Sequence, residues 1–318
     1  MADKTFVNED TYQTLKEFNI EQKLDKGSEK IDEDEYTKRI KPLWKNKNED
    51  SKFKLQLDTA PYSIFVATPV HSDVSMHYTQ ALLMFQKMCA ERRVKVNFQL
   101  MKSSLVTQGR NLCVSHFLNS DATHLLFIDS DILFYPQSIF EMLRADVNLI
   151  SIPYPMKQIH WDKVFNKIED IPNMTELQKN TSGNKFPVKI KDEESDIKCV
   201  DGLIELNFAP TGCMLLKRQV FHKMIQKYPK KIIKQETEID GETLIKPNLY
   251  NFFDTYYDEK EQRYYGEDFA FSRLWRNIGG TCYALITEYI THVGEYQYTG
   301  RLIDEMIAVG IDVSKKKE

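Results

Sequence analysis

Several features that would assign the chain to a specialised class are missing from its 318 residues. No apolar run approaches the length that spans a bilayer, and the N-terminus lacks the apolar core of a signal peptide. The five cysteines are widely spaced and form no Cys-x-x-Cys pair, which argues against a disulfide framework or a zinc site. We therefore expect a soluble, cytoplasmic protein with buried thiols.

A strong excess of charge of either sign is also missing. Lys and Arg number 43 against 47 Asp and Glu, a formal net charge of −4. This balance gives no whole-molecule attraction to nucleic acid or to an anionic membrane, although a local basic groove remains compatible with it. A hydrophobic content of 42% indicates a globular chain, long enough for one large α/β domain.

Strand and helix patterns alternate through the middle of the chain. Such alternation is typical of a doubly wound α/β fold with right-handed crossovers. Apolar patterning predicts strands at 63–70 (ended by Pro69), 94–101, 125–128, 148–152, 203–208, 213–216, 252–257 and 281–287, and helices at 76–92, 107–118, from Pro136, 217–228 and 266–277.

The most informative stretch is the apolar run Leu125–Ile128, which stops at two acids, Asp129 and Asp131. Burying two unpaired carboxylates is costly, so they are expected to face an open site or to be neutralised by a cation. In parallel sheets with helices on both faces, ligands bind beyond the carboxyl ends of the strands, where this pair would lie. A divalent metal holding a phosphate is the interpretation that this pattern favours.

Other proteins carry similar acid pairs. A phosphatase of the haloacid dehalogenase type also has Asp-x-Asp after an apolar strand, but normally after its first strand, with the first Asp as nucleophile. Here roughly 60 residues of α/β pattern precede the pair. An EF-hand is excluded, because no third acid and no glycine follow at the required spacing.

Four sequence features occur in a characteristic order across residues 60–300. Together they resemble the metal-dependent nucleotide-sugar glycosyltransferases of the GT-A fold. They are Ala67-Thr68-Pro69 at the end of the first strand, Gln108-Gly109-Arg110-Asn111 at a helix start, Asp129-Ser130-Asp131, and the late Tyr265-Gly266-Glu267-Asp268 followed by Thr291-His292-Val293-Gly294.

The resemblance implies a mixed, mainly parallel GT-A (Rossmann-like) sheet flanked by helices. The nucleotide-binding half would span 59–152 and the acceptor-binding half 153–310. Outside the resemblance, the many Lys, Glu and Asp residues of 1–58 predict a polar N-terminal arm, partly helical or disordered, and 311–318 is expected to be a solvated tail. The polar tract 166–198 is expected to be a mobile loop or an insertion near the site.

The resemblance also implies a donor site. Asp129, Asp131 and His292 would bind Mn²⁺ or Mg²⁺, since hard oxygens with one imidazole suit these ions. His292 could instead be a hydrogen-bonded residue at a strand end, and Arg110 a surface arginine paired with an acid. The residues expected to contact the nucleotide sugar are Thr68, Pro69, Arg110, Asn111, Asp129, Ser130 and Asp131.

On the acceptor side, Asp268 is the expected catalytic base, with Glu267 as an acceptor or scaffold contact. One of these acids could simply cap the helix that Gly266 opens. Tyr154 and Trp161 could stack on a sugar ring, although core packing explains Trp161 equally well.

The function expected from these features is transfer of a sugar from a nucleoside-diphosphate sugar, with UDP favoured, to an acceptor hydroxyl. The enzyme would depend on a divalent metal, and inversion is favoured over retention. The acceptor could be a glycan, a protein, a lipid-linked sugar or a modified nucleobase. A phosphatase or nucleotidyltransferase that uses the Asp pair, and a non-catalytic carbohydrate-binding relative, remain alternatives.

Overall fold

The computed structural model describes residues 62–162, 164, 183–191, 197–234, 236–239, 242–245 and 247–308. All of them belong to one compact unit, Leu43–Glu318. The predicted N-terminal arm 1–58, most of the tract 166–198 and the tail 311–318 lie outside the described residues.

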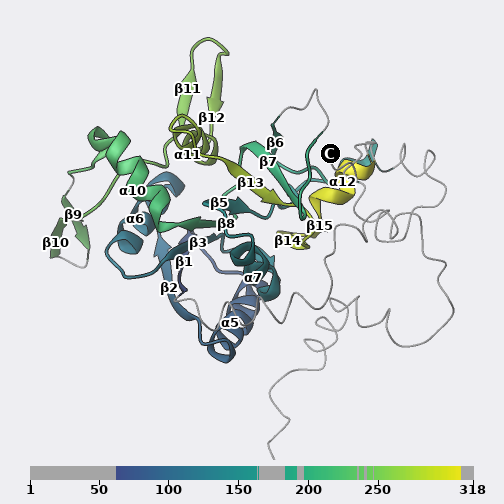
Figure 1. Ribbon diagram of the computed structural model, residues 1–318, viewed down its shortest axis with the longest axis horizontal. Coiled ribbons are helices and arrows are strands. Elements are labelled where there is room, and N and C mark those ends of the chain that lie inside the picture. The colour runs from purple at the N-terminus through teal and green to yellow at the C-terminus, as the bar shows by residue number, and fades with distance from the viewer. Residues whose placement is uncertain are drawn as a thin grey trace, which may run out of the picture. The chain divides into compact units, whose positions relative to one another are not determined.

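An eight-stranded sheet forms the centre of this unit (Figure 1). Its order is β2-β1-β3-β8-β5-β13-β7-β6, and two of its strands, β7 and β8, run against the other six. The expected mixed, mainly parallel α/β sheet is therefore confirmed. Its strands are β1 (Ser63–Val70), β2 (Lys95–Lys102), β3 (His124–Ile128), β5 (Leu149–Ser151), β6 (Lys189–Ile190), β7 (Leu203–Phe208), β8 (Cys213–Lys217) and β13 (Cys282–Leu285).

Helices cover both faces of the sheet because the strands are apolar on both sides. On one face, Phe85 of α5 contacts Phe140 of α7, in a core that includes Ile64 and Val66 of β1. On the other face, Phe117 of α6 contacts Phe65 of β1 and Phe221 of α10. These helices are α5 (Met76–Glu91), α6 (Val106–Leu118), α7 (Pro136–Arg144) and α10 (Arg218–Lys227).

Strand β1 lies between β2 and β3. The chain therefore moves to one side of β1 to form β2 and then crosses to the other side of β1 to form β3, so the strand order reverses at β1. The pairing of β1 with β3 ends at Ala67 and Phe127, before β1 itself ends. Open α/β sheets bind ligands at such a reversal, beyond the carboxyl ends of the strands. This reversal point is where the chain delivers Asp129.

A second, three-stranded sheet, in the order β15-β14-β4, lies beside the main sheet. It pairs β4 (Ile132–Phe134), which directly follows Asp131, with β14 (Ile290–Val293), which carries His292. β14 then pairs with β15 (Gln297–Gly300), and α12 (Leu302–Ala308) follows. The sequence analysis did not predict β4, β14, β15 or α12.

Two hairpins and one more helix complete the described fold. Gly266 precedes α11, and Gly279, with a φ of +83°, follows it in the left-handed region that favours glycine. The remaining elements are η2 (Pro229–Lys231), the hairpin β9 (Glu236–Ile239) and β10 (Glu242–Ile245), the hairpin β11 (Tyr256–Asp258) and β12 (Arg263–Tyr265), and α11 (Glu267–Arg276).

Two sequence predictions about elements were wrong. Residues 252–255 are not a strand, and strand structure starts only at Tyr256. Phe252 and Phe253 are fully buried, but their backbone groups form hydrogen bonds with a side chain of α6 instead of a neighbouring strand. Strand β1 also does not end at Pro69 but continues to Val70, paired with β2 along its whole length.

The interior agrees with the expectation of buried thiols. All five cysteines are free and buried, and Trp275 is 2% exposed in the core. Among the residues that the structure describes, no helix is long and apolar enough to cross a membrane.

Candidate functional site

The Asp129-Ser130-Asp131 turn joins β3 to β4 and is fixed by its backbone. Asp129 N–H donates to the Gly212 carbonyl (3.0 Å), and Ile132 N–H donates back to the Asp129 carbonyl (3.1 Å). The Ser130 carbonyl accepts from the N–H of Ser75, the residue that caps α5 (2.9 Å). The ends of β3, β8 and α5 therefore hold both acids in defined positions.

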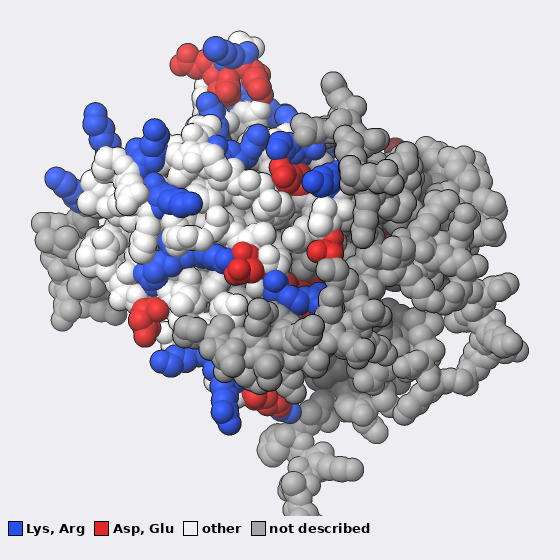
Figure 2. Space-filling view, in the orientation of Figure 1, with Lys and Arg blue, Asp and Glu red and all other residues white. Residues whose placement is uncertain are grey.

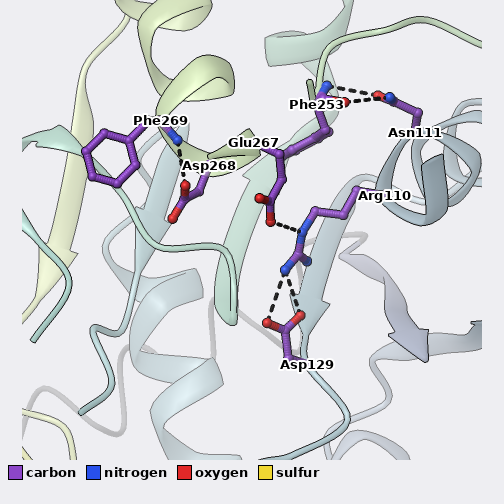
Figure 3. A network of polar contacts seen from close by, with 7 residues as sticks. All are labelled: Arg110, Asn111, Asp129, Phe253, Glu267, Asp268 and Phe269. Atoms are coloured by element: carbon purple, nitrogen blue, oxygen red, sulfur yellow. Dashed lines mark hydrogen bonds and ion pairs between the residues drawn. The ribbon is translucent and has the colours of Figure 1, made fainter. Parts of the chain in front are cut away.

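Arg110 connects this turn to α11 (Figure 3). Its Nη2 donates to both oxygens of Asp129 (2.9 and 3.1 Å), and its Nε donates to Oε1 of Glu267 (3.1 Å). Burial alone would lower the pKa of Arg110, but Asp129 and then Glu267 raise it above its ordinary value. The side chain, only 3% exposed, is thus a permanent cation between two acids.

This placement differs from the predicted one. Arg110 lies in the second turn of α6 rather than the first. Its guanidinium already forms ion pairs with two carboxylates, those of Asp129 and Glu267. The remaining nitrogen, Nη1, is buried and has no hydrogen-bond partner among the described residues. It is the part of Arg110 that could still donate to a ligand.

Asn111 was predicted to contact the nucleotide sugar, but its amide is fully engaged within the fold. Nδ2 donates to the Phe253 carbonyl (2.7 Å) and to Oδ1 of Asn251 (3.1 Å), while Oδ1 accepts from the N–H groups of Phe252 and Phe253 (3.1 and 2.9 Å). Asn111 therefore holds the 251–253 segment against α6, which is a structural role and not a ligand contact.

The side chain of Thr68 is likewise engaged within the fold. It is fully buried, and its hydroxyl lies 2.6 Å from the hydroxyl of Tyr78. Pro69 is partly exposed at the end of β1. Because its side chain is buried, Thr68 could contact a nucleotide only through its backbone, beyond the last β1–β3 pair.

Asp131 points into a different environment from Asp129. Its Oδ2 accepts from Nζ of Lys157 (2.6 Å), and Nε2 of His292 lies 3.3 Å from the same oxygen. Partial burial opposes ionisation, but the hydrogen bonds with His292 and Lys157 lower the pKa of Asp131 to about 2. The carboxylate is 37% exposed, so it is charged and accessible to a ligand.

The orientation of His292 bears on the expected metal. Its Nδ1 lies 3.0 Å from the Pro155 carbonyl, which can only accept, so Nδ1 carries the proton. Nε2 faces Oδ2 of Asp131, to which its N–H donates when that nitrogen is protonated; a bound metal would take the place of this proton, while the carbonyl at Nδ1 fixes the ring as in metal-binding histidines. Nε2 of His292 and Oδ2 of Asp131 lie 3.3 Å apart. Two neighbouring ligand atoms of an octahedral Mg²⁺ lie about 3 Å apart, so this spacing suits the ion.

The protein can thus supply two metal ligands, Asp131 and His292. Asp129, which was expected to be a third, is held by Arg110 instead. Across the described ranges, no group of three or more His, Cys, Asp or Glu side chains could hold a metal ion. A two-ligand site still fits Mg²⁺ or Mn²⁺, because such ions commonly complete their coordination with water and substrate phosphates.

The two acids at the start of α11 differ in their surroundings. Glu267 is paired with Arg110, whereas Oδ1 of Asp268 accepts from the N–H of Phe269 (2.8 Å). Burial, and then the charge of Glu267, raise the pKa of Asp268 to about 6, while the Phe269 N–H opposes the shift. A carboxylate with such a pKa can take a proton near neutral pH.

Tyr154 lies between the two halves of the site. Its ring contacts the His292 ring edge-on, at 5.0 Å between centroids. Burial raises the pKa of its hydroxyl, and the charges of Asp129, Asp268 and Glu267 raise it further against the opposing effect of Arg110. Gly212 is required here, because a Cβ at that position would lie 2.4 Å from Cε1 of Tyr154.

Trp161, the other predicted acceptor residue, is 59% exposed, so the alternative that it belongs to the core is wrong.

Comparison with known proteins gives little further guidance. No protein-family model and no curated protein matches the chain. Among solved structures, 40 chains match. They include A197 from STIV (16% identity over 74% of this chain and 86% of that one, TM-score 0.38), 4-diphosphocytidyl-2C-methyl-D-erythritol synthase from Anaerococcus prevotii (8%, 57% and 81%, TM-score 0.26), and UDP-glucose pyrophosphorylase complexed with UDP-glucose (9%, 72% and 83%, TM-score 0.24).

TM-scores this low support no conclusion about activity, so the site is interpreted from its own geometry. Two of its residues, Lys157 and Gly212, escaped the sequence analysis. Lys157 belongs to no recognisable motif. Only its position shortly after a strand, at the carboxyl edge of the sheet, could have suggested that it lies in the site. Gly212 was seen only as part of a turn between two strands.

Proposed function

We propose that the chain is a glycosyltransferase that moves a sugar from a nucleoside-diphosphate sugar, UDP-linked in the favoured case, to an acceptor hydroxyl. The observation that carries this proposal is the position of Tyr154. It contacts His292, beside Asp131, and it lies within electrostatic reach of both Asp129 and Asp268. The partly buried Tyr154 thus contacts the histidine beside a carboxylate suited to a cation, and it feels the charge of a carboxylate suited to proton transfer.

On the donor side, Asp131 and His292 would hold Mn²⁺ or Mg²⁺ with the diphosphate. The bound ion would stabilise the negative charge that develops on the leaving diphosphate. Lys157 lies at the same carboxylate and can donate to a phosphate oxygen, and Nη1 of Arg110 offers one further unused donor. Ser130 and the end of β1, at Thr68 and Pro69, lie at the same edge of the sheet.

On the acceptor side, Asp268 would take the proton of the attacking hydroxyl as that oxygen forms its bond to the sugar. Its raised pKa suits a base that works near neutral pH. A base separate from the leaving-group site favours an inverting reaction. Glu267 would act through Arg110, keeping the guanidinium and Asp129 in place.

A phosphatase with Asp129 as nucleophile is less well supported. Both carboxylate oxygens of Asp129 accept hydrogen bonds from Nη2 of Arg110, so neither is free to attack phosphorus.

The test is thermal stability against a panel of nucleoside diphosphates and nucleotide sugars, with and without Mn²⁺. Binding to the folded state raises the unfolding temperature. We expect UDP and one UDP-sugar to stabilise the wild type only when Mn²⁺ is present, and not to stabilise Asp131→Ala. Metal-independent stabilisation, or stabilisation that survives in Asp131→Ala, would refute the donor site.

A further inference from the structure

The hairpin β11–β12 projects from the domain next to α11, the helix whose first turn carries Asp268 (Figure 1). Its strands pair Tyr256 with Tyr265 and Tyr257 with Tyr264. Since successive side chains of a strand point to opposite faces, one tyrosine pair lies on each face of the hairpin. Tyr264 is 77% exposed and Tyr257 48% exposed.

The Tyr256–Tyr265 face continues into the site. Tyr256 stacks on Tyr265 (centroids 5.0 Å apart, planes at 15°), Tyr265 contacts Phe269 (5.6 Å), and Phe269 contacts Phe208 (4.4 Å). Together these four rings are the aromatic strip. The backbone N–H of Phe269 donates to Oδ1 of Asp268, so one member of the strip directly follows the proposed base in the chain and holds its carboxylate.

The aromatic strip is not part of the hydrophobic core. Its four members are all partly exposed, whereas Phe252, Phe253 and Phe271 nearby are fully buried. Polar groups border the strip: the guanidinium of Arg273 lies 4.7 Å from the Tyr256 ring centroid, and the Tyr265 hydroxyl donates to Glu261. A row of partly exposed rings with polar groups beside it marks a binding surface.

The charges of the hairpin indicate which class of ligand fits. Both signs meet at its tip (Figure 2). Around the strip, Lys189, Lys260, Arg263 and Arg273 are balanced by Asp258, Glu259, Glu261 and, at the start of α11, Asp268, so there is no surplus of cations. Single-stranded nucleic acids also stack on aromatic side chains, but their phosphates require a positively charged groove. A neutral sugar chain needs none, because its C–H faces pack on rings and its hydroxyls bond to mixed polar groups.

We propose that the aromatic strip binds a neutral oligosaccharide and directs its terminal hydroxyl toward Asp268. This rests on the proposed function, because it identifies the acceptor class of the same site. Several rings in a row imply an acceptor longer than the one sugar that reacts.

The test measures binding of neutral oligosaccharides (gluco-, manno-, galacto- and N-acetylglucosamine tetrasaccharides) to the full chain by calorimetry, with UDP and Mn²⁺ present. We expect at least one to bind, and Tyr265→Ala to weaken it about tenfold or more. Tyr265→Phe keeps the ring and should retain most of the affinity. Tyr264→Ala removes the neighbouring ring on the opposite face and should bind like the wild type.

Stabilisation by UDP with Mn²⁺, measured in parallel, separates the two proposals. If UDP does not stabilise the wild type but Tyr265-dependent oligosaccharide binding is found, the donor site fails and the strip assignment stands. If Tyr265→Ala unfolds at a lower temperature, Tyr256→Ala, one ring further from α11, takes its place. The strip assignment is overturned if no neutral oligosaccharide binds, if the alanine variant binds as the wild type does, or if a thymidine oligonucleotide binds more tightly than every oligosaccharide.

Discussion

The ammonium of Lys157 lies 2.6 Å from Oδ2 of Asp131, the oxygen that Nε2 of His292 also approaches. The ammonium therefore competes for the oxygen that the proposed divalent cation would bind. Since both partners of this ion pair are more than a third exposed, it is worth at most about 1 kcal/mol, and a metal can displace the ammonium.

We expect Lys157→Met to bind Mn²⁺ about two- to fivefold more tightly than the wild type, because the competing cation is gone. Titration of the protein with Mn²⁺, followed by electron paramagnetic resonance, measures this. Lys191→Met is the matched control: its ammonium lies 2.6 Å from Glu205 at similar exposure, away from the site. Equal Mn²⁺ affinity in all three proteins would mean that Asp131 does not bind the metal.

Asp268→Asn should abolish sugar transfer while UDP binding is retained, because the amide cannot accept the acceptor's proton. In the wild type, the rate should fall as pH drops below about 6, where the carboxyl becomes protonated. A rate that is constant from about pH 7 to about pH 5, or an active asparagine variant, would exclude Asp268 as the base.

The same substitution should stabilise the fold at neutral pH. The pKa of Asp268 is raised above its ordinary 3.8, so ionisation penalises the folded state as pH rises from about 4, fully above about 6. Asparagine keeps the acceptor for the Phe269 N–H without the charge. We expect a gain of roughly 1 to 2 kcal/mol in unfolding free energy at pH 8, vanishing below about pH 4, measured by urea denaturation.

Arg110→Met should cost about 3–5 kcal/mol of unfolding free energy, because it leaves the acids Asp129 and Glu267 without their buried cation. Arg110→Lys should recover little, since an ammonium cannot make the same fork of hydrogen bonds. Adding Asp129→Asn and Glu267→Gln to Arg110→Met removes both stranded charges and should restore much of the loss. Urea denaturation of the four proteins tests this, and a mild effect in Arg110→Met would contradict the assigned network.

Gly212→Ala should destabilise the protein by about 1–3 kcal/mol, because the new methyl group would collide with the Tyr154 ring. In a Tyr154→Ala background the ring is absent, so the same substitution should cost almost nothing. This double-mutant cycle isolates the contact. Additive effects would show that Gly212 is required for another reason.

Sequence patterning predicted seven of the eight strands of the central sheet, because buried strands such as Leu125–Ile128 are apolar runs and the edge strand β2 alternates; it missed β6, two residues at the other edge. It failed at 252–257, where two phenylalanines suggested a strand. Asn111 takes up the backbone groups of Phe252 and Phe253, and such a contact between distant parts of the chain leaves no trace in local periodicity.

The site was only partly accessible to the same reasoning. Asp131, His292 and Asp268 were singled out; the structure places His292 beside Asp131 and against the Tyr154 ring, and Asp268 next to Glu267, the partner of Arg110. The partners that decide what each side chain can do were not predictable. Arg110 pairs with Asp129 and also with Glu267, which is 157 residues away from it in sequence, and Lys157 reaches Asp131 from a segment with no motif. Pairing of charges across a fold depends on tertiary placement, which residue type and spacing do not encode.

The small sheet β15-β14-β4 has a consequence for when the site forms. Ile132 pairs with His292, and the N–H of Val293 donates to the Asp131 carbonyl (2.8 Å), so one register fixes both proposed metal ligands. During synthesis, Asp131 leaves the ribosome long before the strand that carries His292 exists. The nascent chain can therefore pair β2, β1, β3, β8 and β5 while it is still unable to capture a metal, whereas β7 joins this sheet only through β13, which directly precedes β14. The last strands to be translated thus complete both the main sheet and the proposed metal site, so a product that ends after β13 would hold the whole main sheet without a competent site.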